Sequence, residues 1–168
     1  MKKYIDFDGV IMDTYMPLFH DYFEKKKNGI YIDDTKHVIN KNWMEVINNS
    51  LVINDAINVI KELNPDNTAI LTRIHSLENE GVAKIKYLRD NGVKCNIILV
   101  PYQVKKTDIV QAKNNVLIDD AVFNLDEWNM AGGIPIFFDT YGNNTDGWGV
   151  ENKKYIKTRT LEILKKYE

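Results

Sequence analysis

The sequence predicts an α/β fold with a mostly parallel sheet and a small helical insert. Short apolar runs of strand length alternate with longer segments of helical periodicity over most of the chain. Such continuous runs are typical of strands that helices cover on both faces of a parallel sheet. The chain has 168 residues, 44% hydrophobic and 27% charged, which is enough for the core of one domain.

The predicted strands are apolar segments with few internal polar residues. They cover residues 4–7, 68–72, 96–100, 115–119 and 134–138. Pro135 lies in the last of them and has no backbone N–H to donate. Because proline is confined to edge strands and strand ends, this strand is expected at an edge of the sheet.

Helices are predicted between these strands. Ser76 is a candidate N-cap for a helix that ends near Asn91 and Gly92, with a buried stripe of Val82, Ile85 and Leu88. Shorter helices are expected from Lys106 or Thr107 through residue 110, over 122–130 and over 158–167.

Residues 14–65 depart from the alternation. Helices are expected over 17–27, 34–48 and 54–63, and the last of these is a candidate crossover helix that returns to the sheet. The predicted organisation is therefore a core domain of residues 1–13 and 66–168, with residues 14–65 as the insert.

Composition excludes some classes of protein. The formal net charge of −2 gives no general reason to expect nucleic-acid or anionic-membrane binding. No apolar run approaches the length of a membrane span, and the single Cys95 fits a reducing compartment. A cytoplasmic protein is the expectation; the oligomeric state stays open.

Two acidic motifs follow predicted strands. Asp6 and Asp8 stand two residues apart before Gly9, and an apolar run ends in Asp119 and Asp120. In open parallel sheets, ligands bind at the carboxyl ends of the strands, so these groups are expected to meet. Paired carboxylates are costly without a cation, and Mg²⁺ prefers oxygen ligands.

A hydroxyl and a lysine extend this group. Thr72 ends a predicted strand and is placed to donate to a phosphate oxygen, although capping the next helix is the common role of such a threonine. Lys105 and Lys106 precede a short helix, and either can balance negative charge. Lys106 is favoured because it stands at the predicted helix start.

These elements, in this order, resemble the motifs of the haloacid dehalogenase-like (HAD) superfamily. That pattern is a strand ending in Asp-x-Asp, a strand-end Ser or Thr, a lysine and an acidic pair, and it matches residues 6 to 120. The resemblance implies a Rossmann-like three-layer core. It also implies that the insert is a small cap, because many members carry a cap between their first two motifs.

The resemblance further implies a Mg²⁺-dependent phosphatase with a small phosphorylated substrate and an aspartyl-phosphate intermediate. The implied roles are nucleophile for Asp6, general acid/base for Asp8, phosphate-binding hydroxyl for Thr72, lysine for Lys106, and metal binding for Asp6, Asp8, Asp119 and Asp120. Members of the superfamily usually also bind the metal ion through the backbone carbonyl at the position of Asp8.

A narrower resemblance is to the small 5'(3')-deoxyribonucleotidases. Its basis is Asp-Phe-Asp-Gly-Val, Leu-Ile-Asp-Asp, and a later segment with Asn124, Trp128, Gly132 and Gly133. Arg73 is a candidate ligand for a second anionic group or a surface residue. Aromatic residues of the insert are candidates for stacking on a base, although packing between helices is favoured: Phe19, Phe23 and Trp43.

Other readings of the same residues stay open. A phosphotransferase or mutase would use the same site, and a non-catalytic HAD fold would use it for binding. A receiver domain is disfavoured because its acidic pair comes before its Thr and Lys. His75 and residues 141–149 are expected in exposed loops, although His75 is close enough to Thr72 to line the site.

Overall fold

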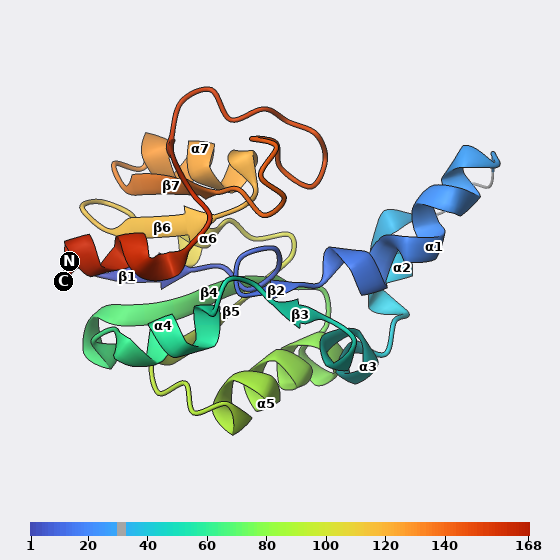
Figure 1. Ribbon diagram of the computed structural model, residues 1–168, viewed down its shortest axis with the longest axis horizontal. Coiled ribbons are helices and arrows are strands. Elements are labelled where there is room, and N and C mark those ends of the chain that lie inside the picture. The colour runs from blue at the N-terminus through green and yellow to red at the C-terminus, as the bar shows by residue number, and fades with distance from the viewer. Residues whose placement is uncertain (30–32) are drawn as a thin grey trace.

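A computed structural model describes residues 1–29 and 33–168. The main sheet is parallel throughout, which confirms the predicted α/β class (Figure 1). In spatial order its strands are β5 (Asn96–Pro101), β4 (Thr68–Ile74), β1 (Lys3–Ile5), β6 (Val116–Asp119), β7 (Ile134–Phe138) and β8 (Ile156–Thr158).

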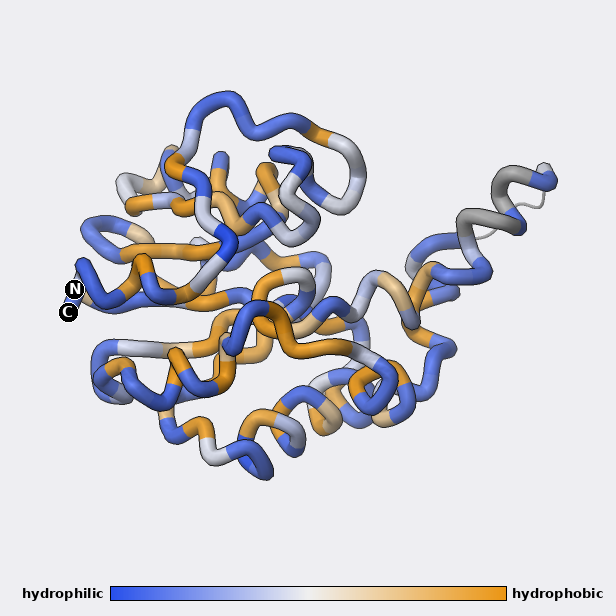
Figure 2. Tube along the Cα trace, in the orientation of Figure 1, coloured by the Kyte–Doolittle hydropathy of each residue, from blue (hydrophilic) through white to orange (hydrophobic). Residues whose placement is uncertain are grey.

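Alternate residues of the strands face two separate cores. Ile5, Ile70 and Ile118 pack with apolar residues of α4 (Ala56–Glu62), α5 (Val82–Asp90) and the 3₁₀ helix η3 (Leu161–Tyr167). The opposite face packs against α7 (Val122–Met130), whose Trp128 is fully buried. The sheet therefore lies between two helical layers, and Figure 2 shows hydrophobic residues gathered along its strands.

The carboxy-terminal part differs from prediction in two ways. The strand with Pro135 is not at the edge, because β8 pairs with it. Pairing between β7 and β8 begins at Ile136. Pro135 comes before this pairing, so the sheet loses no hydrogen bond to β8 from the missing N–H of proline. The helix predicted over 158–167 is wrong at its start, since Thr158 ends β8 and Thr160 caps η3.

The helix predicted after Ser76 begins with a π-helical turn. Residues Leu77–Gly81 form this turn, in which the Gly81 N–H donates to the Ser76 carbonyl at 2.9 Å, and α5 follows directly. The extra residue rotates the helix relative to a regular one. Of the predicted apolar stripe, Leu88 is fully buried and Ile85 is half-buried, whereas Val82 is exposed and Lys84 is buried.

The helices of the insert lie beyond the carboxyl end of the sheet. α1 (Tyr15–Lys27) and α2 (Asp34–Ile39) project from the core (Figure 1). The helix predicted over 34–48 is two helices, because Asn42 caps α3 (Trp43–Asn48) by accepting from the Met44 N–H at 3.2 Å. The exact boundary between core and insert stays a prediction.

Smaller elements complete the fold. A two-stranded antiparallel ladder of β2 (Met12–Asp13) and β3 (Leu51–Val52) lies at the base of the insert, and it was not predicted. The remaining helices are the 3₁₀ turn η1 (Pro65–Asn67) and α6 (Lys106–Ile109), which follows the prediction. Among the described residues, no helix is long and apolar enough to cross a membrane.

Candidate active site

Three carboxylates meet at the carboxyl ends of the central strands. Asp6 directly follows β1, its N–H donates to the Ile118 carbonyl at 3.0 Å, and Asp119 ends the neighbouring β6. Asp6, Asp119 and Asp120 each offer an oxygen, and these oxygens lie within 4.8 Å of one another. All three residues are buried, so the parallel topology gathers acidic groups where water screens them poorly.

Gly9 allows the loop after β1 to pass against this cluster. Its φ is +72°, and a Cβ there would lie 2.3 Å from Asp120 Oδ2 and 2.8 Å from the Tyr15 ring. The Thr140 hydroxyl donates to the Gly9 carbonyl at 2.6 Å. Only glycine fits both the backbone angle and the space beside Asp120.

Lys106, rather than Lys105, lies in the site. Its buried ammonium donates to Asp6 Oδ1 at 2.7 Å and to Asp119 Oδ2 at 2.6 Å. Lys105 has a side chain that is 59% exposed and lies 3.6 Å from Glu127. The position at the start of α6 therefore aims one lysine of the pair at the carboxylates.

Asp8 and Thr72 lie together beside the carboxylate cluster. The Thr14 hydroxyl donates to Asp8 Oδ1 at 2.8 Å, and the Thr72 hydroxyl lies 3.5 Å from Asp8 Oδ2. The side-chain oxygens of Asp8 contact these other partners and are not among the clustered carboxylates. Metal binding by Asp8 through its backbone carbonyl, as the resemblance implies, stays a prediction.

A second buried lysine, Lys84, was not predicted. Its ammonium donates to Asp8 Oδ2 at 2.5 Å and to Thr72 Oγ1 at 3.1 Å, and Glu80 accepts from it at 2.7 Å. Glu80 and Lys84 are spaced four residues apart, which in a sequence usually indicates an exposed ion pair. The signal that could have placed Lys84 inward is its spacing of four residues from Leu88, which is also fully buried on α5.

Electrostatics favour a cation in this site. The pKa of Asp6 is raised to about 7. Burial is the largest cause, the charge of Lys106 lowers this pKa, and the charges of Asp119 and Asp8 raise it. Burial, followed by the charges of Asp119 and Asp6, also holds the pKa of Asp120 well above its usual range. The carboxylates outnumber the two ammonium groups, and three clustered carboxylate oxygens fit the donor preference of Mg²⁺.

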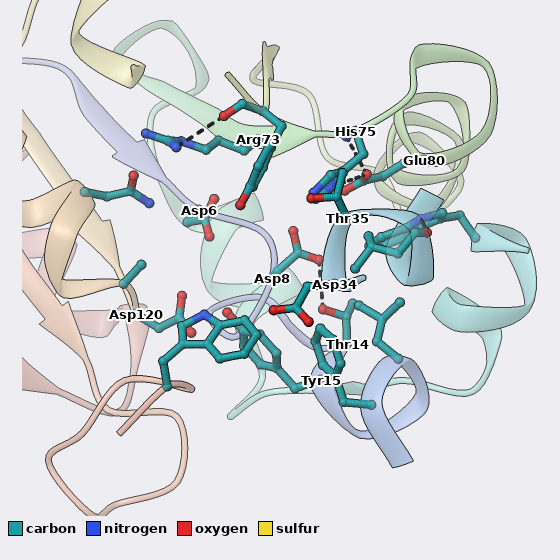
Figure 3. Close-up of a pocket in the computed structure, with 18 of the residues that line it drawn as sticks. Asp6, Asp8, Thr14, Tyr15, Asp34, Thr35, Arg73, His75, Glu80 and Asp120 are labelled. Carbon is teal, nitrogen blue, oxygen red and sulfur yellow. Dashed lines mark hydrogen bonds and ion pairs between the residues drawn. The ribbon is translucent and has the colours of Figure 1, made fainter. Parts of the chain in front are cut away.

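A pocket opens from these groups toward the insert (Figure 3). Asp6, Asp8 and Asp120 face it from the core, and Asp34 and Thr35 of α2 line its other side. A small phosphorylated molecule that entered this pocket would bring its phosphate to the carboxylate cluster and leave the rest of the molecule beside the insert.

Two segments expected in loops contribute residues to this pocket; residues 141–149 are largely exposed, as expected, whereas His75 is mostly buried. The ring of His75 stacks on Tyr102 with centroids 4.2 Å apart, and its side chain is only 15% exposed. In the loop over 141–149, Trp148 lines the pocket and the Asp146 carboxylate accepts from its N–H at 2.9 Å. Loop residues are placed by tertiary contacts that local sequence does not specify.

The candidates for contacting the part of a substrate beyond its phosphate differ in burial and in their contacts. Arg73 lines the pocket, and its guanidinium lies 3.5 Å from Glu127. Trp43 is fully buried and its indole N–H donates to the Val38 carbonyl at 3.2 Å, so it packs the insert. Phe19 is also buried, whereas the side chain of Phe23 is outside the described residues.

Comparisons with known proteins bear on the fold. No protein-family model and no curated protein matches the chain. Among solved structures, HAD-hydrolase YfnB from Bacillus subtilis, bound to magnesium, has a TM-score of 0.61 at 14% identity over 99% of this chain and 97% of that one. A haloacid dehalogenase-like family hydrolase from Streptococcus pneumoniae has a TM-score of 0.58 at 15% identity over 100% and 98%.

A third structure is an enzyme whose reaction is named. The D,D-heptose 1,7-bisphosphate phosphatase from Burkholderia thailandensis has a TM-score of 0.55 at 15% identity, over 94% of this chain and 92% of that one. The similarity extends over nearly the full length of each of these proteins. The chain therefore has the fold of the HAD-like hydrolase superfamily.

Proposed function

We propose that this protein is a Mg²⁺-dependent phosphomonoester hydrolase that forms an aspartyl phosphate on Asp6. The observation that carries the proposal is the contact of Lys106 with both Asp6 and Asp119, beside Asp120. This arrangement brings a carboxylate nucleophile, the fixed ammonium of Lys106 and a set of oxygen ligands together at the carboxyl ends of the central strands. The fold and the magnesium-bound YfnB support the same reading.

The carboxylates of Asp6, Asp119 and Asp120 would hold the metal ion, with Asp8 contributing its backbone carbonyl as the family resemblance implies. When bound, Mg²⁺ supplies positive charge that lets an anionic nucleophile approach an anionic phosphate. Lys106 supplies further charge, because its ammonium lies 2.7 Å from the Asp6 oxygen.

In the first step, an Asp6 oxygen attacks phosphorus as the bond to the leaving oxygen breaks. Protonated Asp8 gives its proton to that oxygen, while Thr72 and Lys106 donate to the phosphoryl oxygens. In the second step, a water attacks phosphorus and passes a proton to Asp8. The bond between phosphorus and the Asp6 oxygen breaks, which releases phosphate and restores the carboxylate.

The proposed substrate is a small phosphorylated metabolite. Such a molecule would lie in the pocket between the core and α2, and Arg73, which lines this pocket, would bind a second anionic group. A (deoxy)nucleoside monophosphate is one candidate within this class. Exposed aromatic residues of the pocket, Tyr102, Phe123 and Trp148, would stack on its base in place of the buried Trp43. A phosphotransferase on the same residues would differ only in the acceptor.

The test is phosphate release from p-nitrophenyl phosphate, nucleoside monophosphates and sugar phosphates, with Mg²⁺ and with EDTA. We expect release that needs Mg²⁺ and falls more than about 10⁴-fold in Asp6→Asn, because an amide cannot form the intermediate. Asp90→Asn is the matched control, since Asp90 is exposed and pairs with Lys86 away from the site. Undiminished turnover in Asp6→Asn would refute the mechanism.

A further inference from the structure

Lys84 is fully buried and contacts four polar groups, unlike a lysine on the exposed face of a helix. Its side chain is 0% exposed, and its ammonium contacts Asp8, Thr72, Glu80 and the carbonyl of Arg73 at 3.1 Å. Burial of an ammonium costs several kcal/mol unless charges and hydrogen bonds compensate it. A buried lysine placed against two residues of the site therefore calls for a role beyond solubility.

Glu80 holds this lysine in place. The Glu80 side chain is 2% exposed, and its second oxygen accepts from the backbone N–H of His75 at 2.7 Å, so the carboxylate is fixed to the end of β4. The ring of Trp43 covers the ammonium at 4.9 Å and that of Phe7 at 5.3 Å. Burial alone would lower the pKa of Lys84, but Asp8 and Glu80 outweigh it and raise the pKa.

The ammonium links Asp8, which lines the pocket, to Thr72, which is fully buried behind it. Asp8 Oδ1 is held by Thr14 and Oδ2 by Lys84, so both of its oxygens are fixed. The same ammonium lies 3.1 Å from Thr72 Oγ1, which leaves the hydroxyl proton available for another acceptor. Without Lys84, Asp8 and Thr72 would share only the 3.5 Å contact between them.

We propose that Lys84, held by Glu80, is a positioning residue that fixes Asp8 and Thr72 for phosphoryl transfer. This inference rests on the proposed function, because it assigns the proton transfer to Asp8. It also divides the work between the two buried lysines that contact the carboxylates of the site: Lys106 serves the nucleophile side of the phosphate, and Lys84 serves the leaving-group side. Effective proton transfer requires the donor within hydrogen-bond reach of the leaving oxygen.

The test compares two substrates that differ in their need for a proton donor. p-Nitrophenolate leaves readily without a proton, whereas the alkoxide of ethyl phosphate does not. In Lys84→Met we expect kcat/KM to fall about 100-fold or more for ethyl phosphate and less than about 10-fold for p-nitrophenyl phosphate. Glu80→Gln is expected to show the same pattern at smaller size, and Lys84→Arg to restore part of the loss.

Lys86→Met is the matched control, because Lys86 lies on the same helix with its side chain 56% exposed. It is expected to leave both substrates unchanged. Equal losses on both substrates in Lys84→Met would show a merely structural lysine and overturn the proposal. Thermal unfolding of each variant separates this outcome from loss of the fold.

A crystal structure of Lys84→Met gives a readout that is independent of turnover. We expect the Asp8 and Thr72 side chains to move by more than about 0.5 Å, the tolerance of a working site. Side chains that keep their places would overturn the positioning role. If the wild-type protein released no phosphate from any substrate, the proposed function would fail, and this structure would still decide whether Lys84 positions Asp8 and Thr72.

Discussion

Gly9 shows how one residue sets the geometry of the proposed metal site. A methyl group there would overlap Asp120, because the added Cβ would lie 2.3 Å from its Oδ2. We expect Gly9→Ala to displace Asp120 and raise the Mg²⁺ concentration for half-maximal phosphate release by about 10-fold or more.

The control for this change is Gly29→Ala. Gly29 has a similar φ of +76°, but an added Cβ meets nothing within 4 Å. Both variants therefore carry comparable backbone strain, and only Gly9→Ala touches the site. An unchanged Mg²⁺ requirement in Gly9→Ala would mean that Asp120 is not held by this close contact.

The sequence indicates candidate residues at strand ends, and it misses a lysine on a helix. Asp6 follows β1 and Asp119 ends β6, as the apolar runs predict. Thr72 was expected at the end of its strand, but β4 continues to Ile74. Lys84 is missed because a lysine four residues after a glutamate usually forms an exposed ion pair. Its burial depends on contacts with Asp8 and Thr72, which helix periodicity does not specify.

At the scale of elements, the π-helical turn also connects the insert to the core. The Asn79 side chain donates to the carbonyl of Lys41 at 2.8 Å and to that of Ile39 at 3.3 Å, and it accepts from the Trp43 N–H at 3.1 Å. We expect Asn79→Ala to lower the free energy of unfolding by about 1–3 kcal/mol, because these backbone groups lose their partner.

Thermal or urea unfolding measures this effect, with Asn91→Ala as the control. Asn91 is exposed and donates only to the Tyr87 carbonyl of its own helix at 2.8 Å, so its loss is expected to cost less than about 0.5 kcal/mol. Equal losses of stability in the two variants would mean that the hydrogen bonds from Asn79 to the insert do not stabilise the fold.

The elements that prediction misses are those with weak local signals. β8 is three residues long and mostly exposed, so it lacks the apolar run that identifies the inner strands. The break between α2 and α3 depends on Asn42, whose capping role competes with an otherwise continuous helical pattern. In both cases tertiary contacts decide an outcome that sequence periodicity leaves open.

At the scale of the whole molecule, the sheet order explains why chain segments far apart share one site. β1 lies between β4 and β6, so the residues that follow these strands meet at the sheet's centre. This convergence is predictable from the parallel class alone. The position of the insert over that edge follows from its place in the chain after β1, but its pocket-lining residues depend on how α1 and α2 pack.

If the clustered carboxylates hold a cation as proposed, the stability of the fold is expected to depend on it. Burial and the neighbouring charges of Asp119 and Asp6 raise the pKa of Asp120, so its ionised form opposes folding when no metal is bound. A metal that binds only the folded chain adds about 2.7 kcal/mol at 100 times its dissociation constant. For a chain of this size, that is about 5–10 °C in melting temperature.

The Asp120→Asn variant separates the destabilising effect of the buried Asp120 charge from the stabilising effect of metal binding. In EDTA we expect this variant to melt higher than the wild type, because a buried like charge is removed and the amide can still accept from Tyr15. With Mg²⁺ the order is expected to reverse, because the variant loses a ligand. Calorimetry of both proteins in EDTA and in millimolar Mg²⁺ measures all four melting temperatures. A Mg²⁺-induced rise that is the same in both would mean that Asp120 does not hold the ion, and the metal would have to be assigned to other oxygens of the site.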